Sequence, residues 1–331
     1  MVAPSVSAKY HLLILFSLAT SPLAAQFVPA GASGPILVRD TPRRPAPDLP
    51  ETLLRADSSL VLIPIHVVTA TGAPVTNLRR ENFRIREDGA DQTIASFVRE
   101  DAPISVGLLF DNSGSMINKI DRAAEAVEAF FQLANPEDEF FLVEFSDRAK
   151  LTVPFTADAT QIHHRIVRSR PAGQTSLFDA IQVGLKEMKT ARHARKALVI
   201  FSDGGDNASR HSFREIRRTL LESDVLVYAL GIFDPDYMRK HPAEEQRGPM
   251  VLDDLTFETG GRHLPVARLE DLAAIGARVS RDLRQQYVLG YYPTSLQTDG
   301  KYRHIRVDLN VPESTTSLRT DYRRGYYSPG F

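Results

Sequence analysis

Cysteine is absent from the 331 residues of this sequence, and neither sign of charge dominates it. Without cysteine the chain can form no disulfides and no thiolate metal sites, so any metal ion must be held by oxygen or imidazole ligands. The 40 basic and 41 acidic side chains leave a formal net charge of −1. This balance predicts neither a nucleic-acid partner nor attraction to an acidic membrane surface.

Hydrophobic runs long enough to cross a membrane are also absent. The apolar run at residues 12–19 is too short to span a bilayer as a mature helix, and no later stretch approaches that length. Lys9 and His11 precede this run, and the small-residue segment 21–25 follows it. This order is typical of a secretory signal peptide, residues 1–25, and predicts an exported protein, either secreted or periplasmic. The alternative is a buried N-terminal helix.

The segments that follow differ in composition. Residues 26–57 are rich in Pro, Ala and Gly, which predicts a linker. Residues 58–101 contain a β-branched run and a hairpin signal at Asp88 and Gly89, and therefore predict short strands. Residues 287–331 include an alternation of apolar and polar side chains that also predicts strands. We expect the two strand-rich segments to pair into one small β-domain.

Residues 102–286 have a different pattern, in which apolar strand-like runs alternate with segments of helical periodicity. Strands that are apolar throughout imply a mostly parallel sheet with helices on both faces. The expected fold class is therefore α/β, a doubly wound, Rossmann-like sheet with a small flanking β-domain. In such sheets, ligands bind outside the carboxyl ends of the strands, where the loops converge.

Three of the loops expected at this edge are rich in oxygen-bearing side chains. They are residues 111–115 (Asp-Asn-Ser-Gly-Ser), 173–176 (Gly-Gln-Thr-Ser) and 202–207 (Ser-Asp-Gly-Gly-Asp-Asn). The candidate metal ligands are two carboxylates and three hydroxyls, from Asp111, Ser113, Ser115, Thr175 and Asp203. Mg²⁺ and Mn²⁺ suit such a set, since Mg²⁺ prefers about six oxygen ligands. With only two carboxylates around it, the ion stays electron-poor and can accept an anionic oxygen from outside.

The order Asp-x-Ser-x-Ser after an apolar strand, then Thr175, then Asp203, resembles the metal-ion-dependent adhesion site of von Willebrand factor A (VWA) domains. The resemblance covers about residues 102–286, and the flanks are similar to a group of exported bacterial VWA-domain proteins. It implies that Ser113, Ser115 and Thr175 contact one metal ion directly or through water. Asp111 and Asp203 would bind it directly or lie just behind its ligands.

The same resemblance implies a function, an exported protein-binding (adhesion or scaffold) module whose ion captures an Asp or Glu carboxylate of a partner protein. A second ion site, found in some VWA domains, needs acidic residues where Asn118 and Lys119 stand, so one Mg²⁺ or Mn²⁺ ion is expected. A metal-free scaffold, in which the Asp and Ser residues only cap helices, is the structural alternative.

A metal-assisted hydrolase that uses the same loops is the functional alternative. A serine of the first loop could be its nucleophile, but the Gly-x-Ser-x-Gly elbow is absent. His163 and His164 fall on a predicted helix away from the loops. Hydrolysis at the ion would need a base poised over it, for which Glu144 and Asp206 are candidates. Glu144 is more typical of a strand residue and Asp206 of a loop or helix cap, so we expect no enzyme activity.

Overall fold

The computed structural model describes residues 60–99, 102–233, 247–295, 297–311 and 317–329. Residues from Ala56 to Phe331 form one compact unit. The expected signal peptide, residues 1–25, and linker, residues 26–57, lie outside the described residues. Among the residues that the structure does describe, no helix combines the length and the apolar character needed to cross a membrane.

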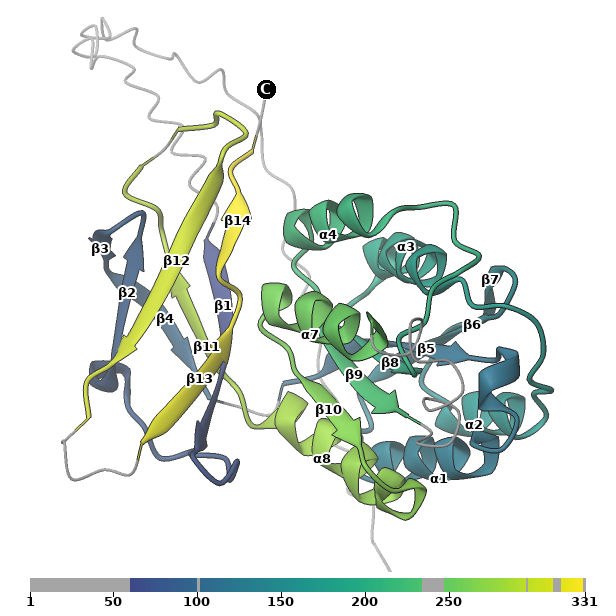
Figure 1. Cartoon of the computed structure of the whole chain (residues 1–331). Helices are drawn as coiled ribbons and strands as arrows, with labels where there is room; N and C mark the ends of the chain where they lie inside the picture. Colours follow the sequence, from purple (N-terminus) through teal and green to yellow (C-terminus); the bar gives the residue numbers. More distant parts are fainter. Residues whose placement is uncertain (1–59, 100–101, 234–246, 296, 312–316, 330–331) are drawn as a thin grey trace, which may run out of the picture. The chain divides into compact units, whose positions relative to one another are not determined.

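A six-stranded sheet forms the centre of the α/β part (Figure 1). Its order is β10-β9-β8-β5-β6-β7, and all neighbours are parallel except β6 and β7. The strands are β5 (Ile104–Asp111), β6 (Glu139–Phe145), β7 (Ala149–Thr156), β8 (Arg195–Ser202), β9 (Leu226–Ile232) and β10 (His263–Val266). The edge strand β7 contains Pro154, which has no N–H to donate and is therefore tolerated at an edge.

Helices cover both faces of this sheet (Figure 1). On one face lie α1 (Ile120–Phe131), α2 (Ala159–Val167) and α8 (Leu272–Arg284). On the other lie α3 (Leu177–Glu187), α4 (Phe213–Glu222) and α7 (Arg247–Thr259). Short 3-10 turns are η1 (Arg80–Asn82), η2 (Gly114–Met116), η3 (Met188–Thr190) and η4 (Leu269–Asp271). The expected doubly wound α/β fold is thus confirmed.

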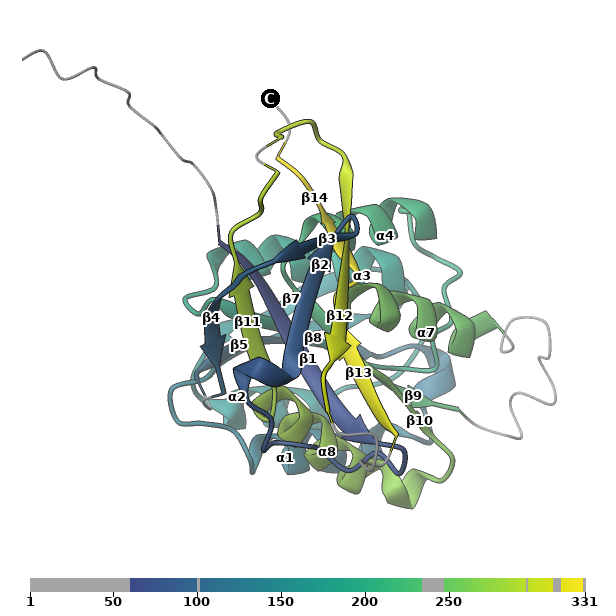
Figure 2. The same cartoon turned by 90° about the vertical axis from the view of Figure 1, so that its left-hand side faces the viewer.

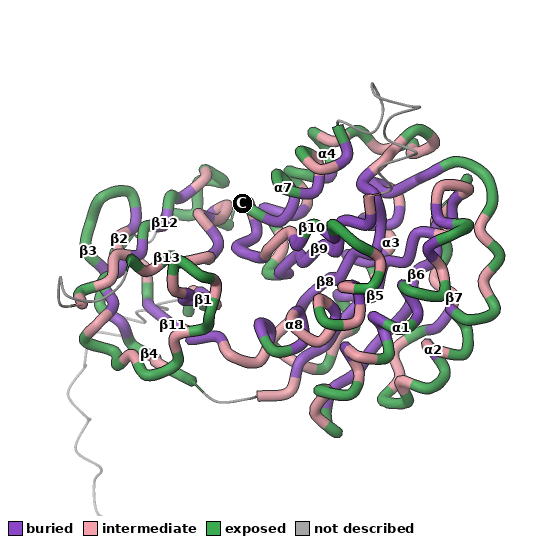
Figure 3. The backbone as a smooth tube through the Cα atoms, turned by 60° about the horizontal axis from the view of Figure 1, so that its bottom comes forward, coloured by how far each residue is buried: buried purple, intermediate pink, exposed green. Residues whose placement is uncertain are grey.

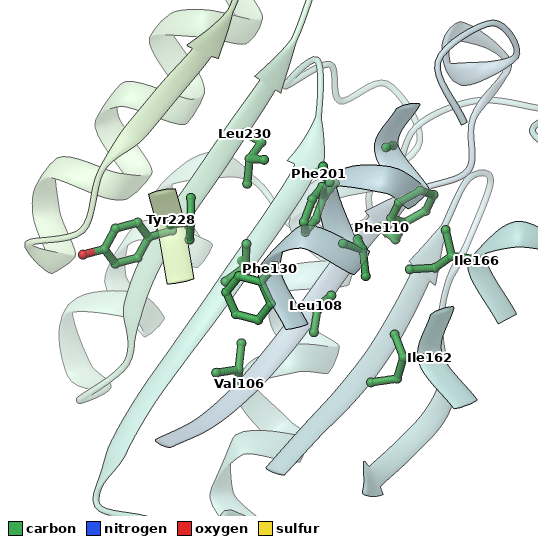
Figure 4. Close-up of a cluster of buried hydrophobic side chains, with 14 of the residues drawn as sticks. Val106, Leu108, Phe110, Phe130, Ile162, Ile166, Phe201, Tyr228 and Leu230 are labelled. Carbon is green, nitrogen blue, oxygen red and sulfur yellow. The ribbon is translucent and has the colours of Figure 1, made fainter. Parts of the chain in front are cut away.

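The central strands are buried on both faces (Figure 3), because successive side chains of a strand point to opposite sides. On β5, Val106, Leu108 and Phe110 point to the face of α1, α2 and α8, where Phe130 and Ile162 meet them (Figure 4). Leu109, between them in sequence, belongs to the apolar cluster on the opposite face. This double burial explains why the strand sequences are largely apolar rather than alternating.

Two antiparallel four-stranded sheets form from the segments on either side of the α/β part (Figure 2). Their orders are β13-β1-β11-β4 and β14-β12-β2-β3. The strands before the α/β part are β1 (Val61–Thr69), β2 (Phe83–Glu87), β3 (Ala90–Gln92) and β4 (Ile94–Val98). Those after it are β11 (Tyr287–Tyr291), β12 (Tyr302–Leu309), β13 (Leu318–Tyr322) and β14 (Gly325–Tyr327).

Every strand of the N-terminal group except β3 pairs with a strand of the C-terminal group. β1 lies between β11 and β13, β4 pairs with β11, and β2 pairs with β12. Apolar side chains from both sheets, among them Ile65, Ile85, Leu289 and Val307, form one shared cluster. These sheets are the flanking β structure that the fold class includes.

Candidate metal centre

The neighbouring parallel strands β5 and β8 bring the first and third loops together. Phe110 of β5 pairs with Phe201 of β8, so the carboxyl ends of the two strands lie side by side. Asp111 is the last residue of β5, and Asp203 directly follows the last residue of β8. Both carboxylates therefore lie at the carboxyl edge of the sheet, where a doubly wound fold places its ligands.

Backbone hydrogen bonds connect the second loop to the other two. Gly114 N–H donates to Gly173 O at 3.1 Å, and Ala172 N–H donates to Asn112 O at 3.0 Å, which joins the second loop to the first. Asn207 N–H donates to Thr175 O at 3.0 Å, and Thr175 N–H donates to Asn207 Oδ1 at 2.8 Å. The three loops that the sequence analysis selected thus form one hydrogen-bonded layer.

Glycine is required where the third loop meets helix α7. Gly204 has a φ of +81°, and a Cβ added to it would lie 2.4 Å from the carbonyl oxygen of Gly248. A Cβ on Gly248 would in turn lie 2.2 Å from the carbonyl oxygen of Asp203. Any larger residue at either position would push the first turn of α7 away from the loop that carries Asp203.

The two carboxylates are buried and hydrogen-bonded. Asp111 has no exposed surface, and its oxygens accept hydrogen bonds from Ser113 N–H at 2.9 Å and from Ser202 Oγ at 2.6 Å. Asp203 is 3% exposed, and its Oδ1 accepts a hydrogen bond from Gly205 N–H at 3.2 Å. These contacts fix the direction of both carboxylates, although each oxygen keeps a lone pair that a cation can use.

The three hydroxyl residues lie on the same loops. Ser113 Oγ is 3.1 Å from Ser115 Oγ, so the alternate positions of the first loop do point to the same side. Ser113 and Thr175 are buried, and Ser115 is half-buried. The hydrogen bonds found for Thr175 use its backbone, which leaves the side-chain hydroxyl available. The structure thus brings the five expected residues onto one set of joined loops.

The electrostatics of this group favour a cation. Burial raises the pKa of Asp111 to about 7, and the negative charge of Asp203 acts in the same direction, whereas hydrogen bonds from Ser113 and Ser202 oppose it. Two buried carboxylates near each other are costly unless positive charge compensates them. The buried oxygens Asn112 Oδ1 and Ser176 Oγ also have no hydrogen-bond partner. By this donor set and this charge the residues fit a hard divalent ion.

Lys119 also lies at this site, although from the sequence it was noted only as a residue that stands where a second metal site would need an acid. Its side chain is 2% exposed, and its ammonium group lies 2.9 Å from Ile232 O and 3.5 Å from Asp203 Oδ2. It occupies the N-cap position of α1, where the helix dipole disfavours a positive charge. A cation directly before the first residue of the expected helix was the signal that the sequence offered.

The candidate bases of the hydrolase alternative are held in structural contacts. Glu144 lies on β6, and its carboxylate accepts hydrogen bonds from Arg165 and Ser169 at 2.5 Å each. Asp206 accepts a hydrogen bond from Phe178 N–H at 3.1 Å, at the start of α3. His163 lies on α2, where its Nε2 is 3.9 Å from Glu128 Oε2.

Clusters of acidic and imidazole side chains are the other places where a metal ion could bind. Within the residues that the structure describes, no three His, Asp or Glu side chains come together as a group that could hold a metal ion. The candidate site has only two carboxylates and completes its oxygen set with hydroxyls. A zinc centre of the His and Asp type is therefore not found in that part of the chain.

Comparisons with known proteins concern mainly the α/β part. Residues 106–205 match the family model of the von Willebrand factor type A domain. A search of the curated proteins finds no match.

Similar solved structures include a von Willebrand factor type A protein from Catenulispora acidiphila, 12% identical over 81% of this chain and 74% of that chain, with a TM-score of 0.45. Proximal thread matrix protein 1 from the mussel byssus, solved with a zinc-occupied metal-ion-dependent adhesion site (MIDAS) motif, is 18% identical over 58% of this chain and 48% of that chain. Its TM-score is 0.47. An aerotolerance-related membrane protein from Bacteroides fragilis is 14% identical over 54% of this chain and 98% of that chain, with a TM-score of 0.44. From the family match over residues 106–205 and the topology of the sheet, the α/β part of this chain has a von Willebrand factor A-like fold.

Proposed function

We propose that this VWA domain binds one Mg²⁺ or Mn²⁺ ion through Asp111, Ser113, Ser115, Thr175 and Asp203. The observation that carries the proposal is the pair of buried carboxylates at the ends of two neighbouring strands. Their loops are joined by hydrogen bonds and supply three hydroxyls on the same layer. Two carboxylates only balance the formal charge of a divalent ion, and neutral hydroxyls fill further positions. The ion therefore stays electron-poor and can accept one more anionic oxygen, which a dedicated all-carboxylate cage would prevent.

An electron-poor ion of this kind can capture an anionic oxygen from another protein. An Asp or Glu side chain of the partner would complete the coordination of the ion. The interaction takes place beside buried groups, where the effective dielectric constant is lower than in water and the attraction is stronger. We therefore propose a metal-dependent protein-binding module, an adhesion or scaffold function, with no catalytic step of its own.

The surroundings of the loops suit a protein surface. Ile117, just after the first loop, is 59% exposed, and Met250, in the first turns of α7, is 58% exposed. Gln174 and Asn207 are exposed on the second and third loops. Exposed apolar side chains next to polar ones are typical of sites where proteins associate, and Met is enriched in interface cores. These four residues would select among partners after the ion has bound the carboxylate.

Export is the second part of the proposal and depends on residues 1–25 alone. Their charged, apolar and small-residue segments are in the order of a secretory signal. The intact mass of the natively expressed protein tests this directly. Cleavage after Ala24 or Ala25 supports export to the periplasm or the medium, whereas a cytoplasmic product that retains Val2 contradicts it.

Metal binding is tested by thermal unfolding at increasing Mg²⁺ concentration. Since an ion that binds only the folded state stabilises it by RT ln(1 + [L]/Kd), the melting temperature should rise continuously with Mg²⁺. The variants Asp111→Ala and Asp111→Asn should lose this dependence. Asp158→Ala is a matched control, because Asp158 only caps α2 and is exposed. It should keep the full Mg²⁺ dependence, and an equal shift in both Asp111 variants would place the ion elsewhere.

Carboxylate capture is tested by selecting binders from a random peptide library in Mg²⁺. The selected peptides should share an Asp or Glu whose replacement by Asn or Gln abolishes binding. Binding should also fail in chelator and with the Ser113→Ala variant. Peptides that bind equally well in chelator, or that contain no required acid, would show that the ion is not the contact.

A further inference from the structure

Lys119 places an ammonium group beside the carboxylates of the proposed metal site. Its ammonium group is buried and has two neighbours, the carboxylate of Asp203 and the carbonyl oxygen of Ile232 at the end of β9. The start of α1, the residue after β8 and the end of β9 are thus connected through one side chain. Burying a lysine in this way costs free energy that an apolar residue would not cost. Its position beside one of the two aspartates points to a role in the charge of the site.

Including Lys119 changes the net charge of the site in both its metal-free and its metal-loaded form. When both are ionised, Asp111 and Asp203 alone carry two negative charges, which a divalent ion would neutralise. With Lys119 the metal-free site carries one net negative charge, and the metal-loaded site carries one net positive charge. A partner carboxylate then brings the total to zero. Without Lys119 the same carboxylate would leave the loaded site with a net negative charge.

We propose, resting on the function proposed above, that Lys119 is a built-in cation that sets the balance between metal affinity and ligand affinity. It repels the divalent ion and thereby weakens metal binding. It attracts the incoming carboxylate and thereby strengthens ligand binding to the loaded site. It also neutralises Asp203 when no metal is bound, so the loops keep their arrangement in the metal-free protein.

A purely structural role makes a different prediction. If Lys119 only fills space and donates a hydrogen bond to Ile232 O, its loss would loosen the loops and weaken metal binding. If it acts through its charge, its loss would strengthen metal binding, because a repulsive charge next to the ion has gone. The sign of the change in metal affinity therefore separates the two roles.

The experiment measures Mg²⁺ binding to the full chain by calorimetry for wild type and Lys119→Met. Met has a similar length and no charge, and Lys119→Gln serves as a second variant that can still donate to Ile232 O. The Kd for Mg²⁺ should fall by roughly tenfold or more in both, given the strength of charge interactions at a few ångströms in a partly buried site. Lys186→Met, an exposed position on α3, removes the same charge far from the loops and should leave the Kd unchanged.

A second readout measures the effect of Lys119 on carboxylate binding, with acetate as the probe. Free Mn²⁺ is counted by electron paramagnetic resonance in excess acetate and in chloride of equal ionic strength. Acetate should lower the apparent Kd for Mn²⁺ in the wild type, because a ligand of the loaded site and the metal assist each other reciprocally. This factor should be smaller in Lys119→Met.

The outcomes distinguish this inference from the proposed function. If the wild type binds Mg²⁺ and both Lys119 variants bind it equally or more weakly, the inference is wrong and the metal site stands. An undiminished acetate effect in the variants would also overturn it. If the wild type binds no divalent ion, the proposed function fails and the inference fails with it. Tighter Mg²⁺ binding together with a reduced acetate effect supports it.

Discussion

His66 shows how a single buried polar residue depends on its surroundings. It lies on β1 with 1% of its surface exposed, 3.4 Å from Arg262 Nη1 and 3.5 Å from Asp282 Oδ1. Burial lowers the pKa of His66 to about 3, and the positive charge of Arg262 acts in the same direction. The imidazole is therefore neutral near pH 7, so its contact with Asp282 is not an ion pair. Arg262 instead pairs with Asp282 at 2.7 Å.

This lowered pKa predicts a loss of stability in acid. The unfolded chain takes up a proton at His66 near pH 6.5, whereas the folded chain does so only near pH 3. The stability that the neutral His66 contributes is therefore complete above about pH 6.5, and it is lost as the pH falls from about 6.5 to about 3. In His66→Gln the melting temperature should fall less between about pH 7 and about pH 4 than in wild type. The measurement is thermal unfolding by circular dichroism at several pH values.

The control for His66→Gln is His164→Gln, which removes an exposed histidine of α2. That variant should follow the wild-type pH dependence. If wild type and His66→Gln lost stability in parallel, the protonation of His66 would not be the cause.

The start of helix α3 shows how a loop stabilises a helix that follows a different strand. Ser176 occupies the N-cap position of α3 but makes no side-chain capping hydrogen bond. Asp206 of the third loop caps the helix instead, since its Oδ1 accepts hydrogen bonds from Phe178 N–H at 3.1 Å and from Ser209 Oγ at 2.6 Å. The start of α3 is therefore held by the same loop that carries Asp203.

Asp206→Ala should lower the free energy of unfolding by about 1 kcal/mol, the usual cost of losing a helix cap. Asp206→Asn keeps an acceptor oxygen in the same place and should retain most of the stability. Urea unfolding of the two variants and wild type provides the comparison. Equal losses in Ala and Asn would mean that charge, rather than the capping hydrogen bond, is responsible.

Helices α1 and α8 approach each other closely at Gly276. A Cβ added there would lie 2.2 Å from the carbonyl oxygen of Ala126 on α1. Gly276→Ala should therefore destabilise the protein by about 1–3 kcal/mol through overpacking, although alanine is the better helix former by about 1 kcal/mol. Thermal unfolding should show the loss. Ala274→Leu, at an exposed position of the same helix, should cost little, and a stabilised Gly276→Ala would mean that the helices can separate without penalty.

The arrangement of the whole molecule follows from strands that pair across the α/β part. β1 pairs with β11 and β13, and β2 pairs with β12, so the sequence-distant flanks need each other. Arg262 and Arg323 add contacts to this arrangement. Arg262 Nε lies 3.4 Å from Asp321 Oδ2 on β13, and Arg323, which follows β13, pairs with Asp224 at the end of α4.

The isolated segment 58–101 should therefore not fold, because β2–β3 is the only pair of strands within its described residues, and an isolated two-stranded hairpin is marginal in water. The fragment 102–286 contains the whole six-stranded sheet and both of its apolar clusters, and should fold alone. Amide spectra of the two fragments test this, with the full chain as reference. Well-dispersed signals from the short segment would contradict the expectation.

The sequence by itself was sufficient to predict the α/β fold, because its signals are local. Strands buried on both faces have continuous apolar runs, as in residues 106–110, and the helices between them repeat at the helical period. The candidate ligands were also found from sequence. Asp111, Ser113 and Ser115 lie within one short loop, and Asp203 directly follows an apolar strand. Their assignment as metal ligands stays a prediction that the experiments above test.

Only the tertiary structure decided the features that depend on contacts between distant residues. Lys119 and an exposed lysine look alike in a sequence. Lys119 is buried because its side chain lies against Asp203, just after β8, and Ile232, at the end of β9. The cap that Asp206 provides and the register of β1 against β11 likewise join residues far apart in the chain. The physical reason is that burial and charge environment are properties of packed surfaces, which the local pattern of a single segment does not contain.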